Sequence, residues 1–278
     1  MINVDLHLHT RGSDGSDSAE EVISKAEKKG LDLISITDHD SIKSVPEGIE
    51  AGKKAGIAVI PGVEFSVAHD TEMHILGYFI DIENKAISEK LNQLERDRYE
   101  RVVGFVKSLC KNGVDITLDD IKKRAFGGSL SRAHIADALT EKGYAKNKDE
   151  AFEKFLNSDS KSFVNKEKVS KEESIRLIND AGGIAVLAHP IYNFDEKFEN
   201  VLDELLAFGL NGMEIFHPDH TDQQAKEFEE IAMKKAMLVT CGSDYHGRLK
   251  PEIEIGCETR TSEYLDYCIN LFYNKALK

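Results

Sequence analysis

The sequence predicts an α/β fold interrupted by a helical insertion, and three observations support this prediction. Short apolar runs alternate with helix-like segments over the first third of the chain, which is the rhythm of a parallel sheet or barrel. From about residue 84 to residue 168 the alternation gives way to helices without intervening strands. It resumes from residue 170, so we expect one core built from residues 1–83 and 169–278, with residues 84–168 as a helical cap.

The first expected helix, residues 18–29, has both a start and a stop signal. Ser18 and Glu21 form a capping-box pattern, and Gly30 follows the last turn. Further helices are expected at residues 45–54, 86–111, 171–180, 196–208, 222–235 and 262–273, and near Leu118, Arg132 and Asp149.

Six apolar runs of strand length end in side chains that can bind metals or transfer protons. The runs are residues 2–6, 31–37, 57–63, 184–188, 213–216 and 238–242. The side chains that follow them are His7 and His9, Asp38 and His39, Glu64, His189, His217, and Asp244 and His246. Barrel-type and open α/β enzymes assemble their sites at the C-terminal ends of strands, so we expect these groups to meet. His74 is an exception, because it precedes its apolar run.

Composition narrows the class of protein. The net charge of -14 argues against a protein that coats long nucleic acid, although bound divalent ions could still hold a phosphorylated substrate. The chain shows no signal-peptide pattern and no apolar run long enough to span a bilayer, so we expect a cytoplasmic protein without a membrane partner. Cys110, Cys241, Cys257 and Cys268 lack disulfide spacing and are expected to be reduced and mostly buried.

The recurring histidines and carboxylates predict a site for more than one metal ion. Imidazole and carboxylate are the ligand types that hold borderline divalent metals. Alternation along a strand would turn His7 and His9 to the same face. A single histidine is more often an ordinary surface or hydrogen-bonded residue, and we assign His69 to that class, with His220 as a second candidate for it.

The order of these motifs resembles that of the polymerase and histidinol phosphatase (PHP) superfamily of metal-dependent phosphoesterases. The motifs are H-x-H at His7, T-D-H ending at His39, G-x-E ending at Glu64, A-H-P around His189, and S-D-x-H from Ser243. The resemblance covers the two core segments. It implies a distorted (β/α)7 barrel that holds up to three divalent ions, Mn²⁺, Fe²⁺ or Zn²⁺.

The resemblance also implies which residues bind each ion. The implied ligands are His7, His9, Glu64 and Asp244 for the first ion, Glu64, His74 and His189 for the second, and Asp14, His39 and His246 for the third. Some relatives have histidine at the position of Asp14, so the third site is expected to differ in metal preference and occupancy. Asp38 is expected to orient a ligand imidazole, with capping of the next helix as the alternative.

A second resemblance, to stand-alone phosphoesterases that act on nucleotides, lies in the insertion. The sequence S-R-A-H-I-A from Ser131 is similar to their R-P-H-I-A element, which implies that Arg132 and His134 reach a substrate phosphate. Their spacing suits neighbouring faces of a strand or one side of a short turn. A guanidinium offers a planar fork for two phosphate oxygens. The alternative is an arginine at a helix start paired with a carboxylate such as Asp137.

Three further residues have expected roles near the chemistry. Asp244 is expected to be essential for turnover, and His217, beside Pro218, could protonate the leaving alkoxide, contact substrate or be structural. After A-H-P the family often has a basic residue, whereas this chain continues Ile-Tyr-Asn, so Tyr192 is the expected replacement for a substrate contact.

The expected reaction is hydrolysis of a phosphate ester by metal-activated hydroxide, without a phosphoenzyme. The candidate substrates are a nucleoside 3′,5′-bisphosphate, a nucleoside monophosphate or a short 5′-phosphorylated RNA. Histidinol phosphate is an alternative, and the R-x-H-I-A insertion counts against it. A non-catalytic scaffold is another, disfavoured because every ligand position holds a coordinating side chain. No obligate protein partner and no redox or nucleotide cofactor is indicated.

Overall fold

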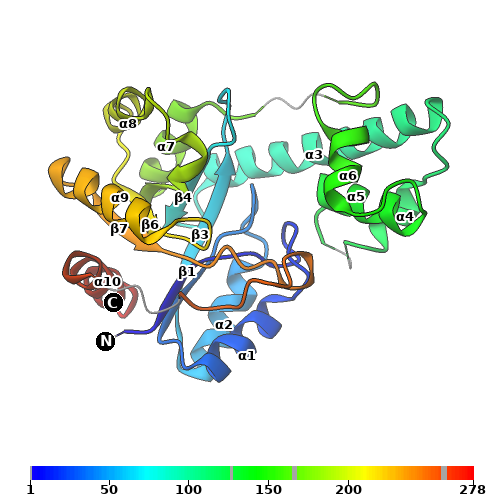
Figure 1. The fold of residues 1–278 in the computed structure, drawn as a ribbon. Coiled ribbons are helices and arrows are strands. Elements are labelled where there is room, and N and C mark those ends of the chain that lie inside the picture. Colours follow the sequence, from blue (N-terminus) through cyan, green and yellow to red (C-terminus); the bar gives the residue numbers. More distant parts are fainter. Residues whose placement is uncertain (1, 126–127, 165–167, 258–261) are drawn as a thin grey trace.

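The computed structural model describes residues 2–125, 128–164, 168–257 and 262–278. Within these residues seven strands form one sheet that curls into a nearly closed barrel, with a group of helices to one side (Figure 1). The strands are β1 (Val4–Leu8), β2 (Leu33–Ile36), β3 (Ala58–Ser66), β4 (His74–Tyr78), β5 (Ile184–Leu187), β6 (Gly212–Phe216) and β7 (Leu238–Cys241). The predicted α/β class and distorted seven-stranded barrel are confirmed.

The barrel closes between its first and last strands. The sheet follows chain order from β1 to β7. An isolated parallel bridge joins Leu8 to Tyr245, and the backbone N–H of His9 donates to the carbonyl of Tyr245 at 2.9 Å. The end of β1 therefore lies beside the segment that follows β7, and residues from the two ends of the chain share one rim.

β4 runs against its neighbours. It pairs antiparallel with both β3 and β5, whereas the other four neighbouring pairs are parallel. His74 is its first residue and lies opposite Ser66 near the C-terminal end of β3. The reversed direction explains the exception in the sequence, because the start of β4 lies at the rim where the other strands end.

Helices cover the outside of the barrel. They are α1 (Ala19–Lys29), α2 (Val45–Ala55), α7 (Lys171–Asp180), α8 (Phe198–Ala207), α9 (Asp222–Lys234) and α10 (Glu263–Ala276). The predicted capping box is present at α1, where Ser18 Oγ accepts from the Glu21 N–H at 3.2 Å and Glu21 Oε2 accepts from the Ser18 N–H at 2.7 Å. Gly30 ends this helix in a left-handed conformation, φ 70°.

The insertion forms a second group of helices. It contains α3 (Lys85–Lys111), α4 (Leu118–Lys122), α5 (Arg132–Glu141) and α6 (Lys148–Ala151), the last continued by a π-helical turn (Phe152–Leu156). In Figure 1, α3 reaches from the barrel to the other three. These helices share an apolar cluster that includes Phe105 and Leu139 and is separate from those of the barrel. The first part of α3, in contrast, packs in a barrel cluster through Ile87, Leu91 and Leu94. The division into barrel and cap stays a prediction, and residues 126–127 and 165–167 of it lie outside the described part.

Two expectations from composition can be compared with the fold. None of the described helices is both long and apolar enough to cross a bilayer. All four cysteines are free; Cys241 and Cys268 are buried and Cys257 is half-buried, but Cys110 near the end of α3 is exposed. The expectation of mostly buried cysteines is therefore wrong for Cys110, which lies on the solvent side of the helix.

The domain division predicts a local response to a cavity in the cap. Leu139 is fully buried in the cap cluster, so Leu139→Ala should destabilise the cap by about 2–5 kcal/mol. Hydrogen exchange should quicken within residues 102–156 while β1–β7 stay protected. The matched control is Leu202→Ala, a buried leucine packed in the barrel cluster. Equal loss of protection in barrel and cap from Leu139→Ala would contradict the division.

Candidate metal centre

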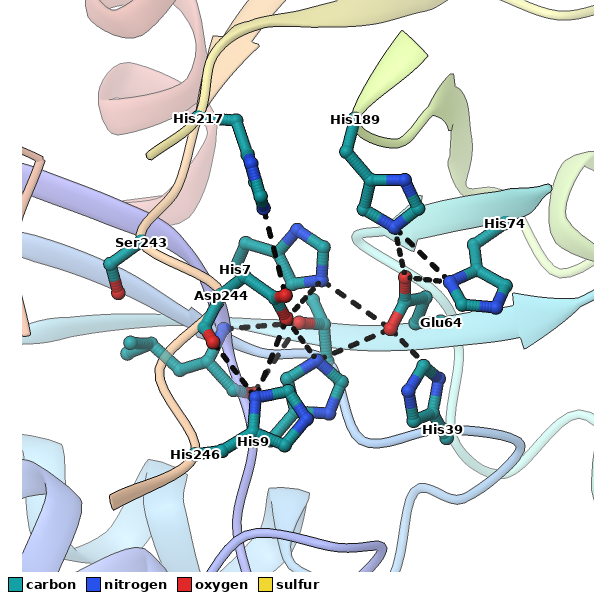
Figure 2. A network of polar contacts seen from close by, with 12 residues as sticks. His7, His9, His39, Glu64, His74, His189, His217, Ser243, Asp244 and His246 are labelled. Carbon is teal, nitrogen blue, oxygen red and sulfur yellow. Dashed lines mark hydrogen bonds and ion pairs between the residues drawn. The ribbon is translucent and has the colours of Figure 1, made fainter. Parts of the chain in front are cut away.

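Glu64 is the centre of the cluster at the barrel rim (Figure 2). Its carboxylate is fully buried and lies within 3.4 Å of nitrogen atoms from five imidazoles. These belong to His7, His9, His39, His74 and His189, which come from or directly follow four different strands. The strand ends therefore bring together the groups that the sequence predicted to meet.

The first expected ligand set converges on one side of Glu64. Glu64 Oε2 lies 3.4 Å from His7 Nε2 and 3.2 Å from His9 Nε2. Asp244 Oδ1 lies 3.4 Å and 3.1 Å from the same two nitrogens. Two imidazoles and two carboxylates thus face a common point.

The second set converges on the other oxygen of Glu64. His74 Nδ1 lies 2.8 Å and His189 Nε2 3.1 Å from Glu64 Oε1, and the two nitrogens are 3.1 Å apart. The carboxylate of Glu64 therefore stands between two groups of donors, as a bridging ligand would.

The third group of potential ligands contains one more residue, His9, than the sequence predicted. The ligand atoms of His9, Asp14, His39 and His246 all lie within 4.8 Å of one another. His246 Nε2 is 3.3 Å from Asp14 Oδ1, and His39 Nδ1 is 2.8 Å from Glu64 Oε2. The structure thus adds His9 to Asp14, His39 and His246, and connects this group to Glu64 through His39.

Hydrogen bonds behind the cluster fix which nitrogen of each ring faces it. His7 Nδ1 lies 3.0 Å from Glu214 Oε1, and His246 Nδ1 lies 2.8 Å from the backbone oxygen of Asp244. Carboxylate and carbonyl oxygens can only accept, so both Nδ1 atoms donate and the Nε2 lone pairs face the cluster. These two rings are therefore oriented as ligands before any ion binds.

Asp38 acts on His9 through a serine. Asp38 Oδ1 accepts from Ser13 Oγ at 2.7 Å, and Ser13 Oγ lies 3.3 Å from His9 Nδ1. Asp38 also accepts from the N–H and the hydroxyl of Thr10. The N-cap of α2 is Ser44, so Asp38 does not cap that helix. The orienting role expected for Asp38 is therefore favoured over the capping role, with one residue between it and the ring.

Two buried carboxylates in this layer were missed by the sequence reasoning. Glu214 accepts from the His189 N–H at 2.8 Å as well as from His7. Asp5 accepts from the hydroxyl and N–H of Ser243, at 2.6 and 3.0 Å, and burial raises its pKa to about 6 despite these bonds. Both lie inside apolar runs, and Asp5 shares the strand face of His7. A charged residue within a buried strand was the signal available.

The backbone at the strand ends is unusual. His189 and Asp244, just after β5 and β7, have φ of 26° and 53°, a region that Asn, Asp and His adopt more readily than other side chains. A Cβ at Gly242 would lie 2.1 Å from His7 Cβ, so only glycine fits between β7 and the first ligand. These turns let the chain leave each strand while its side chains point into the cluster.

The cluster fits divalent cations. Among the described residues, five of its buried donor atoms have no hydrogen-bond partner although they crowd one another, namely His7 Nε2, His9 Nε2, His39 Nδ1, Glu64 Oε2 and Asp14 Oδ1. Buried polar atoms normally have partners, and this mixture of imidazole and carboxylate suits borderline metals. Burial acts to raise the pKa of Glu64, but the nearby imidazoles outweigh it and hold that pKa well below its usual value.

A cleft of about 900 Å³ opens from the cluster toward the cap. Six basic side chains line it in a chain whose net charge is -14, namely Arg98, Arg101, Arg132, Lys148, Lys168 and Lys250. Phe105, Phe152 and Phe163 also contribute to its walls. Six acidic side chains line it too, namely Asp14, Glu64, Asp70, Glu72, Asp159 and Asp244. The cleft therefore combines basic, acidic and aromatic side chains beside the buried donors.

Arg132 lies on the cleft wall, but on a helix. It is the first residue of α5 rather than part of a strand or an isolated short turn, and its guanidinium lies 5.6 Å from the centre of the Phe152 ring. Asp137 pairs with Lys148 at 3.1 Å instead of with Arg132, so the alternative pairing expected from sequence is wrong. Within the described residues Arg132 has no hydrogen-bond acceptor.

His134 departs from its expected place. Its Nδ1 accepts from the Ser131 N–H at 3.2 Å, so the ring caps its own helix. The side chain is buried, 1 % exposed, and is not among the residues that line the cleft. The expected contact with substrate is therefore not seen, because the helical turn directs the ring back to the backbone.

His217 lies behind Asp244. Its Nδ1 accepts from the Asp219 N–H at 3.1 Å, so the neutral ring carries its proton on Nε2, which lies 3.6 Å from Asp244 Oδ2. The ring is buried and does not line the cleft. Of the roles left open for His217, this position favours orienting Asp244 over protonating a leaving group.

Three other polar side chains complete the comparison with the sequence. Tyr192 lines the cleft, its hydroxyl donates to Asp219, and its ring lies 5.0 Å from that of His189. His69 also lines the cleft, and its assignment as an ordinary surface histidine stays a prediction. His220 is buried behind His217 and lies 2.9 Å through Nδ1 from the Ile215 carbonyl, as a structural histidine would.

Comparison with known proteins identifies similar chains. Residues 5–215 match the family model of the PHP domain. A 5′-3′ exoribonuclease of Haemophilus influenzae is 32% identical over 87% of this chain and 89% of its own length. A 3′,5′-nucleoside bisphosphate phosphatase of Chromobacterium violaceum is 31% identical over 88% of each chain. A crystal structure from Bifidobacterium adolescentis, classed as a metal-dependent phosphoesterase, has a TM-score of 0.84 at 30% identity, covering 97% of this chain and 95% of that one.

The position of Glu64 predicts how the protein responds to metal. Saturating Mn²⁺ should stabilise the chelator-treated protein by about 3–4 kcal/mol at 100 to 1,000 times the dissociation constant, seen as a rise in Tm. Glu64→Gln should lose most of this gain and bind fewer ions by elemental analysis, because Glu64 contacts donors of all three sets. Glu254→Gln, at a surface pair with Lys29, is the control. An undiminished gain in Glu64→Gln would rule out the proposed cluster.

Proposed function

The chain belongs to the PHP family, so it is an enzyme that hydrolyses phosphate esters, and we propose that its substrates are small nucleotides. The observation that carries this proposal is the cleft, where cations and aromatic rings of the cap face the buried donors of the barrel. A phosphate would lie at the donors, and the remainder of a nucleotide would extend along the cap.

We infer that the three donor sets around Glu64 hold divalent ions. The proposed ligands are His7, His9, Glu64 and Asp244, then Glu64, His74 and His189, then Asp14, His39 and His246. When bound, such ions would lower the pKa of water and offset the charge of a phosphate. We propose up to three ions, with Mn²⁺, Fe²⁺ and Zn²⁺ as the candidate metals.

Arg132 is the proposed contact for a second phosphate. Burial lowers the pKa of Arg132; Glu72 opposes this effect and Arg98 adds to it. Burial also lowers the pKa of Arg101 to about 10, with Arg132 as the next cause. Cations that repel one another on a partly buried wall are stabilised by an anion between them. The guanidinium lies 5.6 Å from the centre of the Phe152 ring, and its planar fork can donate to two phosphate oxygens at once. A nucleoside bisphosphate supplies such a second anion.

Aromatic side chains beside these cations suit a base. Phe152 and Phe163 are half-buried and line the cleft, so part of each ring faces it. Stacking of a base on an aromatic ring contributes about 1–3 kcal/mol and tolerates any base. Tyr192, on the barrel side of the same cleft, is the proposed contact that replaces the basic residue common in the family.

A second candidate function, trimming of short RNA from its 5′ end, is favoured by the size of the cleft. Its volume of about 900 Å³ is near the upper end of the range for small-molecule sites, roughly 300–1,000 Å³, so more than one nucleotide fits. Histidinol phosphate has no second phosphate for Arg132, which counts against it. A non-catalytic scaffold is disfavoured, because each proposed ligand position keeps a coordinating side chain.

Removing the charge of Asp244 should abolish turnover. Asp244→Asn keeps the shape of the side chain but weakens a donor that contacts His7 and His9, so phosphate release should fall at least about 100-fold while circular dichroism is unchanged. Asp203→Asn, which breaks only a surface pair with Lys235, should behave as the unaltered protein. Full activity of Asp244→Asn would refute the proposed centre.

A substrate panel tests the role of the cap. Mn²⁺-loaded protein should hydrolyse adenosine 3′,5′-bisphosphate or 5′-phosphorylated RNA in preference to histidinol phosphate. Arg132→Met should raise KM for the bisphosphate about 10- to 100-fold with little change for adenosine monophosphates, because only the bisphosphate uses the second contact. Arg124→Met is the control, since Arg124 lies on the cap outside the cleft and pairs with Glu141.

Each other outcome of the panel has a defined meaning. Preference for histidinol phosphate would overturn the assignment to nucleotides. An equal effect of Arg132→Met on all substrates would contradict the proposal that Arg132 binds a second phosphate. Inactivity on the whole panel would revive the scaffold interpretation.

A further inference from the structure

Lys250 contacts the proposed metal ligand Asp244 through Oδ2, the oxygen that does not face His7 and His9. Its Nζ donates to Asp244 Oδ2 at 2.5 Å. The other oxygen, Oδ1, lies 3.1 Å from His9 Nε2 and 3.4 Å from His7 Nε2. The two oxygens of one carboxylate therefore face different groups, and the contact with Lys250 leaves Oδ1 in place among the donors.

The backbone that carries Lys250 is held independently of this ion pair. Ser16 Oγ accepts from the Arg248 N–H at 2.9 Å, and the Ser16 N–H donates to the His246 carbonyl at 3.1 Å. Gly247 is left-handed, φ 65°, and a Cβ there would lie 2.2 Å from Ser16 Oγ. The Lys250 N–H closes the turn by donating to the Gly247 carbonyl at 3.2 Å. The turn thus fixes where the lysine side chain starts.

The ammonium group of Lys250 is accessible from the cleft. Its side chain is 38% exposed and lines the cleft, so the ammonium is reachable by a ligand. An ammonium has three donors, and Asp244 accounts for one of them. Further donors are therefore available to a bound anion.

Lys250 differs in origin from the other cations of the cleft. Of the six basic residues that line it in the described part of the chain, the other five lie within residues 84–168. Lys250 alone comes from the barrel, on the segment that follows β7. Arg98 of the cap reaches the backbone oxygen of His39 and pairs with Asp40. Lys250, in contrast, pairs directly with the side chain of the proposed ligand Asp244, beside which the reacting phosphate is expected to lie.

We propose that Lys250 donates a hydrogen bond to a non-bridging oxygen of the phosphoryl group that is hydrolysed, and that it favours phosphate monoesters over diesters. A monoester carries two negative charges near neutral pH and a diester one, so a fixed cation attracts the monoester more strongly. In a diester, one charged oxygen is replaced by an ester oxygen, which is a poorer acceptor. This inference rests on the proposed function. By it, Lys250 shifts the balance between phosphatase activity on monoesters and exonuclease activity on diesters toward the phosphatase.

The first test measures binding of inorganic phosphate to Mn²⁺-loaded protein by calorimetry. Lys250→Met should weaken binding about tenfold or more, as expected for loss of a charged hydrogen bond, and Lys250→Arg should restore part of it. Lys29→Met, at a surface ion pair with Glu254, is the control and should bind as the unaltered protein does. Elemental analysis of each variant records its metal content. Should Lys250→Met fail to fold, Lys250→Gln carries the same comparison.

Two results would overturn the contact with phosphate. One is unchanged phosphate affinity in Lys250→Met. The other is a variant that holds less Mn²⁺ yet binds phosphate normally once Mn²⁺ is saturating, because Lys250 would then serve only to position Asp244.

The second test compares a monoester and a diester with the same leaving group, p-nitrophenyl phosphate and bis(p-nitrophenyl) phosphate. Lys250→Met should lower kcat/KM for the monoester about tenfold more than for the diester. An equal loss on both would overturn the role in specificity. Inactivity of the unaltered protein on all phosphate esters would refute the proposed function instead, while the phosphate-binding comparison still decides whether Lys250 contacts the anion.

Discussion

The burial of one carboxylate, Glu64, is the constraint on which the rest of the site depends. A charged group without solvent is costly unless opposite charge or hydrogen-bond donors surround it, and here five imidazoles do so. No single segment of chain can supply five rings around one carboxylate. The barrel can, because its strand ends meet on one rim, and the reversed direction of β4 brings His74 to that rim as well. The topology is thus what makes the charge tolerable.

A second layer determines whether these rings can act as ligands. An imidazole offers a lone pair to the cluster only if its other nitrogen keeps the proton, and Glu214 imposes this on His7, while the Asp244 carbonyl does so for His246. His217 shows the opposite case, because a backbone N–H at its Nδ1 leaves a proton on Nε2. The hydrogen-bond partner behind each of these rings therefore determines whether its other nitrogen presents a lone pair, as a metal ligand must, or a proton.

The sequence predicted the features that depend on local pattern. The strand ends, the α/β class, the helices and the set that meets at the rim follow from apolar runs and the side chains after them. What the sequence did not predict depended on partners far along the chain or on the exact course of a helix or turn. In the sequence, Asp5 and Glu214 are single charged residues inside apolar runs. Their roles become visible only when the folded strands place them beside Ser243 and His7. His134 turned inward because a helix begins at Arg132. Lys250 lies six residues beyond Asp244, and only the turn at Gly247 returns it to that carboxylate.

Charge is distributed unevenly between the barrel and the cap. The chain as a whole is acidic, with a net charge of -14, yet the cleft is lined by cations, five of them in the insertion. Acidic side chains line the cleft as well, and all of them except Asp159 belong to the barrel segments. Divalent ions at Asp14, Glu64 and Asp244 would offset the charge of these three carboxylates and attract an anion. Changes in the cap can therefore alter which anion is held without disturbing the donors around Glu64. Lys250 is the exception, because it belongs to the barrel but is positively charged like the cleft-lining Arg and Lys residues of the cap. Its contact with Asp244 ties recognition of the phosphate to the cluster beside it.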